Sequence, residues 1–389
     1  MLRKAIFPIF LIGLISFAFG AGFYFGKAEC QVCPPEELDF SLFWEAWHKL
    51  EEKFVEPGKI DYKTMLYGAI SGMTSSLKDP YTVFMPPADS KIFKEDVSGE
   101  FQGVGMEIGL RNGELTVIAP LEGTPAQRAG LLAGDKILKV NGTTTQSLTV
   151  DEAVKLIRGP RGEAVVLTIF REGWSSTKDF EIVRDVIIIP SIKWELKEDN
   201  IAYIELYHFS ETARAAFNQV AIEILASPSQ KIILELRNNP GGYLEVAQDI
   251  AGWFLERGQI VTIEDFGGKE EEKEYKAAGN AKLLSYPLVV LINQGSASGS
   301  EILAGALRDN RGVKLIGETS FGKGSVQQLE ELKEGSLKIT VAQWLTPKGE
   351  RINGQGLTPD MEIEMTEEDY DEDRDPQLDK AIEILKELR

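Results

Sequence analysis

Two short segments in the second half of the chain combine a reactive side chain with glycine-rich surroundings. In residues 293–301 (NQGSASGSE), Ser298 stands where a buried strand meets the start of a helix. Free N–H groups and the positive end of the helix dipole at that point suit an attacking oxygen and a developing oxyanion. In residues 318–327 (ETSFGKGSVQ), Lys323 lies between two glycines and beside apolar residues. Burial lowers the pKa of a lysine, and a fall of about three units, or ~4 kcal/mol, would make Lys323 a base near neutral pH. Together they suggest a Ser-Lys pair.

Each residue alone has a simpler explanation. Ser298-x-x-Glu301 is a capping box, which by itself explains both residues. Lys323 alone is typical of a surface lysine in a glycine loop. The scarcity of histidine favours the pair, because a Ser-His-Asp triad would have to use His48 or His208. The same scarcity argues against a histidine-based zinc site, and we expect no metal and no cofactor.

A third segment, residues 236–242 (LRNNPGG), also follows a buried strand and opens a helix. The Pro-Gly-Gly sequence frees backbone N–H groups, so Gly241 or Gly242 is a candidate oxyanion donor. The alternative interpretation is an ordinary tight turn.

These segments belong to a region, residues 175–365, in which strands and helices alternate. Strands are predicted at 201–206, 231–236 and 287–292, and helices at 211–225, 244–257 and from about 299 to 307. This order predicts an α/β core with a largely parallel sheet. Sites in such sheets lie at the carboxyl ends of the strands, where residues 236–242 and 293–301 stand.

Residues 98–174 carry several short apolar runs separated by turn signals. Strands at 104–110 and 115–118 are joined by Arg111–Glu114, a hairpin signal. With the later stretch AGLLAGDKILKVNG, the region resembles a PDZ domain. In such domains a loop, here Gly103, Val104, Gly105 and Met106, turns N–H groups toward the C-terminal carboxylate of a peptide that adds as a strand. Glycine permits that close approach. An ordinary glycine-rich turn is the alternative.

The N-terminal segment differs in composition from the rest. An apolar run of 22 residues, Ala5–Gly26, follows Arg3 and Lys4 and is long enough to span a bilayer. The charges predict a cytoplasmic N-terminus and a body on the far side of the membrane. A signal peptide cleaved near Gly20-Ala21-Gly22 is the alternative. Cys30 and Cys33 either form a disulfide, within the chain or across a dimer, or are unimportant thiols.

The remaining segments are helical or acidic. Residues 35–54 and 61–77 have helical periodicity, with an aromatic stripe that suits a core or a partner helix. Residues 367–375 are an acidic linker before an amphipathic C-terminal helix. The predicted parts are therefore an anchor and linker (1–34), a helical region (35–97), a PDZ-like unit (98–174), a core (175–365) and a C-terminal linker and helix (366–389). The net charge of −19 argues against nucleic acid as a partner.

From about residue 40 to its end, the sequence resembles the C-terminal processing peptidases, also called tail-specific proteases, of serine peptidase family S41. The resemblance covers YGAISGMTSSLKDPYT, the PDZ-like unit, LRNNPGGYLEVA, INQGSASGSEILAGALRDN, GETSFGKGSVQQ and TPKGERINGQGLTPD. It implies a multidomain α/β fold with a ClpP/crotonase-like serine protease core. It implies Ser298 as nucleophile, Lys323 as base, and Gln327, one helical turn beyond the lysine, in support.

The resemblance also assigns the remaining site residues. The oxyanion donors are the Gly299 amide and one in Gly241-Gly242, and Gly299 replaces the usual alanine. Arg158 matches an arginine that in some members couples peptide binding to assembly of the active site. The implied partners are protein substrates held by their C-terminal tails, with dimerisation through the helical ends in some members, and a regulatory adaptor is a further candidate.

The predicted function is therefore a serine endopeptidase at the cell membrane, with an extracytoplasmic body that cleaves envelope proteins. The main alternative is a catalytically inert, membrane-anchored PDZ scaffold. A crotonase-like acyl-CoA enzyme would share the core fold but would require neither the PDZ-like unit nor the anchor.

Overall fold

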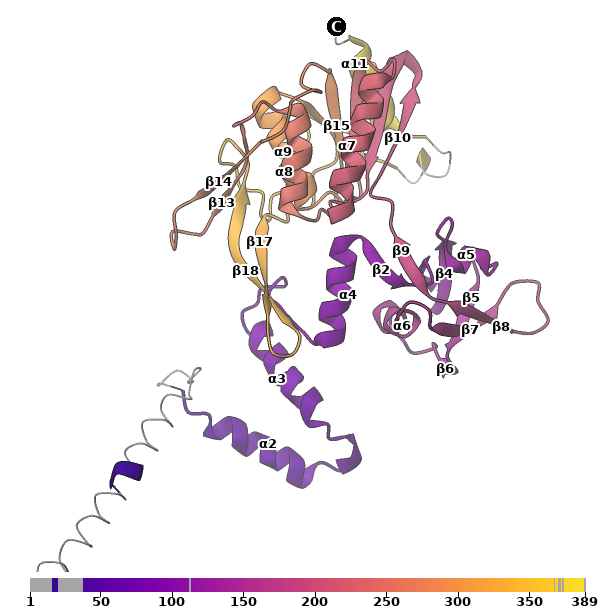
Figure 1. The fold of residues 1–389 in the computed structure, drawn as a ribbon, viewed down its shortest axis with the longest axis vertical. Helices are drawn as coiled ribbons and strands as arrows, with labels where there is room; N and C mark the ends of the chain where they lie inside the picture. Colours follow the sequence, from indigo (N-terminus) through magenta and orange to yellow (C-terminus); the bar gives the residue numbers. More distant parts are fainter. Residues whose placement is uncertain are drawn as a thin grey trace, which may run out of the picture. The chain divides into compact units, whose positions relative to one another are not determined.

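The computed structural model describes residues 16–19, 38–111, 113–366, 368, 369, 372 and 374–387 (Figure 1). The chain divides into two compact units, residues 1–68 and 69–389. The predicted anchor, Ala5–Gly26, lies outside the described residues apart from 16–19, and so do Cys30 and Cys33. Over the described ranges, no helix is long and apolar enough to cross a membrane.

The first unit contains the first part of the predicted helical region, up to residue 68. It holds α2 (Ser41–Lys53), the short 3₁₀ helix η1 (Pro57–Lys59) and the first residues of α3 (Tyr62–Ser75). Both predicted helices are confirmed, with later starts and earlier ends. Trp47 stacks on Tyr62 with 6.1 Å between ring centroids. No residue of α2 is fully buried, so the aromatic stripe is not a closed core within this unit.

A six-stranded sheet forms the core of the second unit, in the order β10-β11-β12-β15-β16-β19. The edge strand β10 pairs antiparallel with β11, and the other pairs are parallel, so the predicted α/β core is confirmed. The strands are β10 (Ile192–Lys197), β11 (Ile201–Leu206), β12 (Lys231–Glu235), β15 (Leu288–Ile292), β16 (Lys314–Gly317) and β19 (Met361–Glu362), with η2 (Glu198–Asn200) between β10 and β11.

Helices cover both faces of this sheet because its central strands are apolar on both sides. Ile232 and Leu234 pack into the larger core with α7, α8 and α9, whereas Ile233 packs into a second core with α11 (Figure 1). The helices are α7 (Glu211–Ala226), α8 (Leu244–Phe254), α9 (Gly299–Arg311) and α11 (Pro376–Glu387).

The PDZ-like unit has its own sheet, in the order β3-β4-β5-β7-β8 with β6 paired to β5, and its own apolar core. The predicted hairpin is confirmed, with Arg111 opposite Glu114. A two-stranded ribbon of β2 and β9 leads into and out of this unit. The elements are β2 (Glu100–Gly103), β3 (Met106–Arg111), β4 (Glu114–Pro120), α5 (Pro125–Arg128), β5 (Lys136–Val140), β6 (Thr143–Thr144), α6 (Val150–Ile157), β7 (Ala164–Phe170), β8 (Lys178–Val183) and β9 (Asp185–Ile188).

The structure contains a further sheet that the sequence did not predict. Its strands pair in the order β1 (Val83–Met85), β18 (Ser336–Leu345), β13 (Ile260–Asp265) and β14 (Lys273–Lys276), and β17 (Ser325–Glu331) also pairs with β18. Its longest strands are half-exposed and carry many polar residues, so they lack the apolar runs of the core. Pairing of β1 with β18 joins the segment before α4 (Pro87–Ser98) to the strand pair that follows Lys323.

The C-terminal helix is tied to the core by a partly buried charge network. Arg237, just after β12, donates two hydrogen bonds to Asp375 at 2.9 and 2.7 Å and one to Gln377 at 2.8 Å. Its guanidinium also contacts Glu235 at 2.5 Å. Asp375 belongs to the predicted acidic linker, yet it has this defined structural contact. The network therefore fixes the chain where it enters residues 238–242.

We expect Asp375→Asn to lower the free energy of unfolding by about 2 kcal/mol at pH 7, because the Arg237 charge would lose its partner. Burial alone would raise the pKa of Asp375, but hydrogen bonds from Arg237 and Leu378 hold it below its ordinary value. A depressed folded pKa contributes stability above the unfolded pKa of about 3.9, and this is lost as pH falls further. Denaturant titrations should therefore show the difference between variant and wild type shrinking below about pH 4.

The matched control is Asp379→Asn, an exposed carboxylate in the first turn of the same helix. It removes the same charge without touching Arg237. An equal loss of stability in both variants would contradict the role given to the ion pair.

Candidate active site

Two predicted segments meet at the carboxyl ends of the neighbouring parallel strands β12 and β15. Asn238 and Asn293 join the two loops: the main-chain N–H of Asn238 donates to Asn293 Oδ1 at 2.8 Å, and Asn293 Nδ2 donates to Asn238 Oδ1 at 2.9 Å. The Ala297 N–H donates to Asn239 O at 3.0 Å. The loop after β12 thus supports the loop that carries Ser298.

The three serines of residues 293–301 differ in environment. Ser296 and Ser300 are fully buried, and their hydroxyls donate to the main-chain carbonyls of Leu236 and Asn239 at 2.8 and 2.9 Å. Ser298 is only partly buried, and in the described part of the chain no hydrogen bond has its hydroxyl as the donor. Ser298 is therefore the serine whose proton can pass to a base.

Ser298 has an unusual backbone conformation, with φ 53° and ψ −113°. A residue other than glycine in this region carries about 1–3 kcal/mol of strain, which its surroundings must offset. Ser298 precedes α9 and forms the predicted capping box with Glu301, whose carboxylate accepts the Ser298 N–H at 2.8 Å. On the other side, a Cβ built on Gly241 would lie 2.7 Å from Ser298 Cβ. Contacts on both sides therefore hold the strained residue.

Gly241 and Gly242 have different roles in the loop. The Gly241 N–H donates to Asn239 Oδ1 at 2.9 Å, and the fully buried Asn239 also donates to Leu206 O at 2.6 Å. Among the described hydrogen bonds, the N–H groups of Gly242 and Gly299 have no acceptor. A Cβ on Gly299 would lie 3.5 Å from the Gly242 nitrogen. This geometry favours Gly242 and Gly299 as the pair of free donors beside Ser298.

Lys323 lies on a loop that contacts the serine loop. The Phe321 N–H donates to Ser296 O at 3.0 Å, so the two main chains meet. Lys323 is partly buried, and its Nζ lies 5.6 Å from the ring centroid of Tyr81. Tyr81 belongs to the segment before β1, which the sequence did not place near the site. In the described residues no hydrogen bond joins Lys323 Nζ to Ser298 Oγ.

Electrostatics at Lys323 favour the neutral amine. Burial lowers the pKa of Lys323, and the positive charge of Lys338 on β18 lowers it further, whereas Glu301 opposes both. The shift has the direction that the sequence predicted for a base. The pKa of Lys338 is itself lowered by burial, with Asp79 opposing.

Glu301 connects the two loops, which the sequence did not predict beyond the helix cap. Besides the Ser298 N–H, its carboxylate accepts hydrogen bonds from Ser320 Oγ at 2.6 Å, the Gly322 N–H at 2.7 Å and the Lys323 N–H at 3.0 Å. The available sequence signal was the position of Glu301 three residues after Ser298, but that signal does not reveal the partner loop.

The predicted helical position of Gln327 is wrong. Gln327 lies on β17, because residues 325–331 pair with β18 rather than continuing a helix. Its Nε2 donates to Ser325 O and Ser325 Oγ at 3.0 and 2.7 Å. Four residues along a strand do not return a side chain to the same place, so the helical argument for a contact with Lys323 does not apply.

In the PDZ-like unit, Gly103 ends β2, Val104 is buried, and Gly105 has φ +76°. A Cβ on Gly105 would lie 2.4 Å from Thr124 Cβ, so this position requires glycine. The N–H groups of Val104 and Gly105 have no acceptor among the described hydrogen bonds. Beside them lies a small cavity of about 60 Å³, lined mainly by apolar side chains of Phe101, Val104, Met106, Ile108, Val154 and Ile157, with Gly105 and Arg158.

Arg158 lies at the side of this groove and contacts α4. Its guanidinium is 4.3 Å from the Phe101 ring centroid and forms an ion pair with Asp96 at 2.7 Å. Its buried Nη1 lies 3.7 Å from Glu95 Oε2 and has no hydrogen-bond partner among the described residues. Arg158 therefore lies between the groove and the helix that leads back to β1.

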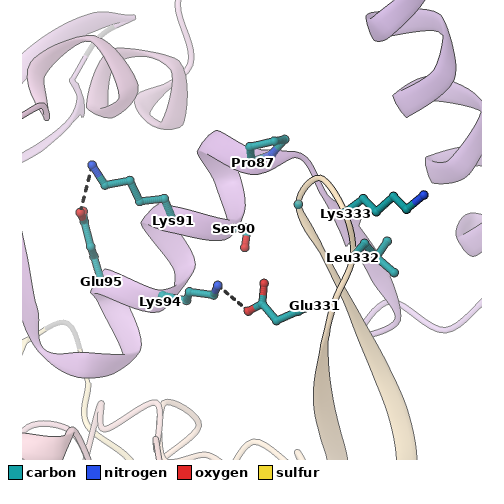
Figure 2. A pocket seen from close by; sticks show the side chains of 9 residues that line it. Pro87, Ser90, Lys91, Lys94, Glu95, Glu331, Leu332 and Lys333 are labelled. Atoms are coloured by element: carbon teal, nitrogen blue, oxygen red, sulfur yellow. Dashed lines mark ion pairs between the residues drawn. The ribbon is translucent and has the colours of Figure 1, made fainter.

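A larger cavity, of about 380 Å³, lies between α4 and the hairpin that joins β17 to β18 (Figure 2). Charged side chains line much of it and pair with one another, Lys94 with Glu331 at 2.5 Å and Lys91 with Glu95 at 3.7 Å. Neither Ser298 nor Lys323 lines this cavity, so it is separate from the candidate active site.

Comparisons with known families match three parts of the chain. The profile of peptidase family S41 matches residues 200–363, and that of the PDZ domain matches residues 116–171. The profile of the activating protease CtpB N-terminal domain matches residues 29–88. The S41 match includes both Ser298 and Lys323.

Individual relatives cover most of the chain. The carboxy-terminal processing protease CtpA of Bacillus subtilis is 37% identical over 327 residues, which are 84% of this chain and 69% of that protein. The carboxy-terminal-processing protease of Bartonella bacilliformis is 39% identical over 310 residues, 78% of this chain and 70% of that protein. The solved structure of the photosystem II D1 C-terminal processing protease has 29% identity and a TM-score of 0.51, over 83% of this chain and 92% of that one.

We expect Gly241→Ala to destabilise the fold much more than Gly258→Ala. Both glycines have φ +94°, so the backbone strain of an alanine, about 1–2 kcal/mol, is the same at each site. The new Cβ at Gly258 meets open space, whereas at Gly241 it would lie 2.6 Å from Ala297 O and 2.7 Å from Ser298 Cβ. Urea titrations of both variants isolate the steric part. Equal midpoints would show that the two loops do not pack as described.

Proposed function

Because the chain belongs to the carboxy-terminal processing proteases, serine peptidases of family S41, we propose that it cleaves proteins with Ser298 as nucleophile and Lys323 as general base. The observation that carries this assignment is the position of Ser298, partly exposed at the start of α9 with two free amide donors beside it. The inert scaffold and the acyl-CoA enzyme are not favoured, because the family model that matches residues 200–363 is that of a peptidase family.

In the proposed reaction, the neutral Lys323 amine takes the Ser298 hydroxyl proton as Oγ attacks the carbonyl carbon of the scissile bond. The carbonyl oxygen becomes negative and accepts hydrogen bonds from the Gly242 and Gly299 N–H groups. The intermediate collapses as Lys323 returns the proton to the leaving amine, which leaves an ester on Ser298. Lys323 then takes a proton from water as the water oxygen attacks the ester carbon, and it returns this proton to Ser298 Oγ as the ester bond breaks.

The proposed reaction requires one side-chain movement, and a supporting role for Gln327 requires a second. Lys323 Nζ must come within hydrogen-bond distance of Ser298 Oγ, since no hydrogen bond joins them in the described residues. A supporting role for Gln327, which the family resemblance implies, requires its Nε2 to exchange Ser325 for Lys323. Both are side-chain movements within otherwise hydrogen-bonded loops.

We further propose that the groove at Gly103, Val104, Gly105 and Met106 binds the C-terminal tails of substrates. The free N–H groups of Val104 and Gly105 suit a carboxylate, and the apolar lining suits an apolar terminal residue. Arg158 would couple occupancy of the groove to the active site through its contacts with α4. These features support recognition of a tail before cleavage.

The proposed setting is the outer side of the cell membrane. The apolar run Ala5–Gly26 with Arg3 and Lys4 before it supports a single-pass anchor and an extracytoplasmic body that acts on envelope proteins. A homodimer and a regulatory adaptor protein complete the proposal as partners. The exposed apolar side chains of α2 support a protein contact in that region.

We expect Ser298→Ala and Lys323→Met to lower kcat for an unstructured substrate with an apolar tail by at least about 1,000-fold. For the wild type, kcat/KM should rise with pH as Lys323 loses its proton, with a midpoint below the ordinary lysine pKa of 10.5, because burial favours the neutral amine. The control is Lys333→Met, an exposed lysine in the β17–β18 hairpin. Turnover like that of the wild type in either site variant would reject the dyad.

A second experiment addresses the tail. The same peptide substrate is prepared with a free C-terminal carboxylate and with a C-terminal amide. The amide should raise KM about tenfold or more, because it removes the charge that the Val104 and Gly105 N–H groups would bind. Identical KM values for the two peptides would exclude carboxylate recognition in this groove.

A further inference from the structure

We propose that Glu301 is a positioning residue of the peptidase reaction, whose single carboxylate holds the main chain at Ser298 and at Lys323 and so fixes the nucleophile relative to the base. This inference rests on the Ser298–Lys323 chemistry proposed above. It goes beyond the capping box, which accounts for only the contact between Glu301 and the Ser298 N–H.

The Glu301 carboxylate accepts hydrogen bonds from both the Ser298 loop and the Lys323 loop. Oε2 accepts the N–H groups of Ser298 at 2.8 Å and Lys323 at 3.0 Å, so one oxygen atom bridges the two reactive residues. Oε1 accepts Ser320 Oγ at 2.6 Å and the Gly322 N–H at 2.7 Å. All four acceptor positions of the carboxylate are therefore filled, and three of its four donors come from residues 320–323.

Burial raises the pKa of Glu301, whereas the four hydrogen bonds that its carboxylate accepts favour the ionised form. Glu301 is only 1% exposed, and such a group is tolerated inside a protein only when hydrogen bonds replace the lost water. A glutamine has one acceptor oxygen, and its NH₂ group would face two N–H or O–H donors. Four donors directed at one side chain thus require both carboxylate oxygens, and a helix cap requires only one of them.

The charge of Glu301 acts on the same lysine that its oxygen positions. Three groups face Lys323: Lys338 from β18, the Tyr81 ring from the segment before β1, and Glu301 from α9. Burial and Lys338 favour the neutral amine, and Glu301 favours the charged one. Removal of the Glu301 charge would leave the first two unopposed, so Lys323 would lose its proton at lower pH.

The experiment compares Glu301→Gln with a matched control, Glu264→Gln, in the full chain. Glu264 on β13 is also buried, 7% exposed, and accepts the Tyr275 hydroxyl at 2.7 Å, but among the described residues no hydrogen bond or ion pair joins it to either reactive loop. For Glu301→Gln we expect kcat to fall about 100-fold, as for a small misplacement of reacting groups, with KM within about twofold of the wild type. The acid-side midpoint of its kcat/KM profile should move to lower pH, and the control should change neither quantity.

A purely structural role would lower the amount of folded enzyme without moving the pH midpoint. Thermal unfolding of each variant shows that the assays compare folded proteins. A folded Glu301→Gln enzyme with wild-type kcat, or with an unchanged midpoint, overturns the proposal. If Glu301→Gln does not fold, Ser320→Ala removes one of the four donors without changing any charge. It should lower kcat about tenfold at unchanged KM, and an unchanged kcat overturns the proposal.

The Ser298→Ala variant separates this inference from the function on which it rests. If Ser298→Ala remains active, the proposed dyad fails and the role of Glu301 fails with it. If Ser298→Ala is inactive while Glu301→Gln keeps the wild-type kcat and midpoint, only the role of Glu301 fails.

Discussion

Parallel pairing of β12 with β15 is the constraint on which the rest of the site depends. Because the carboxyl ends of adjacent parallel strands lie at one edge of the sheet, the loops after them must share the same space. Hydrogen bonds join the two loops where they meet. Asn238 and Asn293 bind one another, and the hydroxyls of Ser296 and Ser300 donate to carbonyls of the opposite loop. The only serine left out of this arrangement is the partly exposed Ser298. Ser298 is thus available for reaction because the other polar side chains of these loops form hydrogen bonds with one another or with the main chain.

The sequence predicts the parts of the protein in which one local pattern dominates. The buried strands at 201–206, 231–236 and 287–292 are largely apolar, and β11, β12 and β15 lie there with at most one residue of difference. The sheet of β1, β13, β14, β17 and β18 escapes prediction because its strands are half-exposed and are stabilised by pairing across long stretches of chain. The helical interpretation of Gln327 fails for the same reason, since the partner that makes residues 325–331 a strand begins at Ser336.

In the candidate active site, too, the sequence predicts some features and misses others. Ser298, Lys323 and the Pro-Gly-Gly loop stand in motifs that can be read along the chain, but the contacts that control their chemistry come from elsewhere. Tyr81 and Lys338 reach Lys323 through the unpredicted sheet, and Asn239 decides which glycine N–H remains free. These contacts depend on register between distant strands, which neither composition nor spacing encodes. The sequence can therefore name the reacting groups, whereas their protonation and alignment follow from the tertiary structure.

Helix capping and catalysis are compatible at Ser298 because they use different parts of the same residues. The cap needs acceptors for N–H groups at the start of α9, and the Glu301 carboxylate supplies one to Ser298. The reaction needs a hydroxyl proton that donates to no fixed carbonyl, together with free N–H groups beside the attacked carbon. Both requirements can be met because Ser298 has a positive φ and lies outside the regular helix, while α9 begins at the next residue. The strain of that conformation is offset by contacts on both sides, so the stability of the helix start and the geometry of the nucleophile depend on the same few atoms.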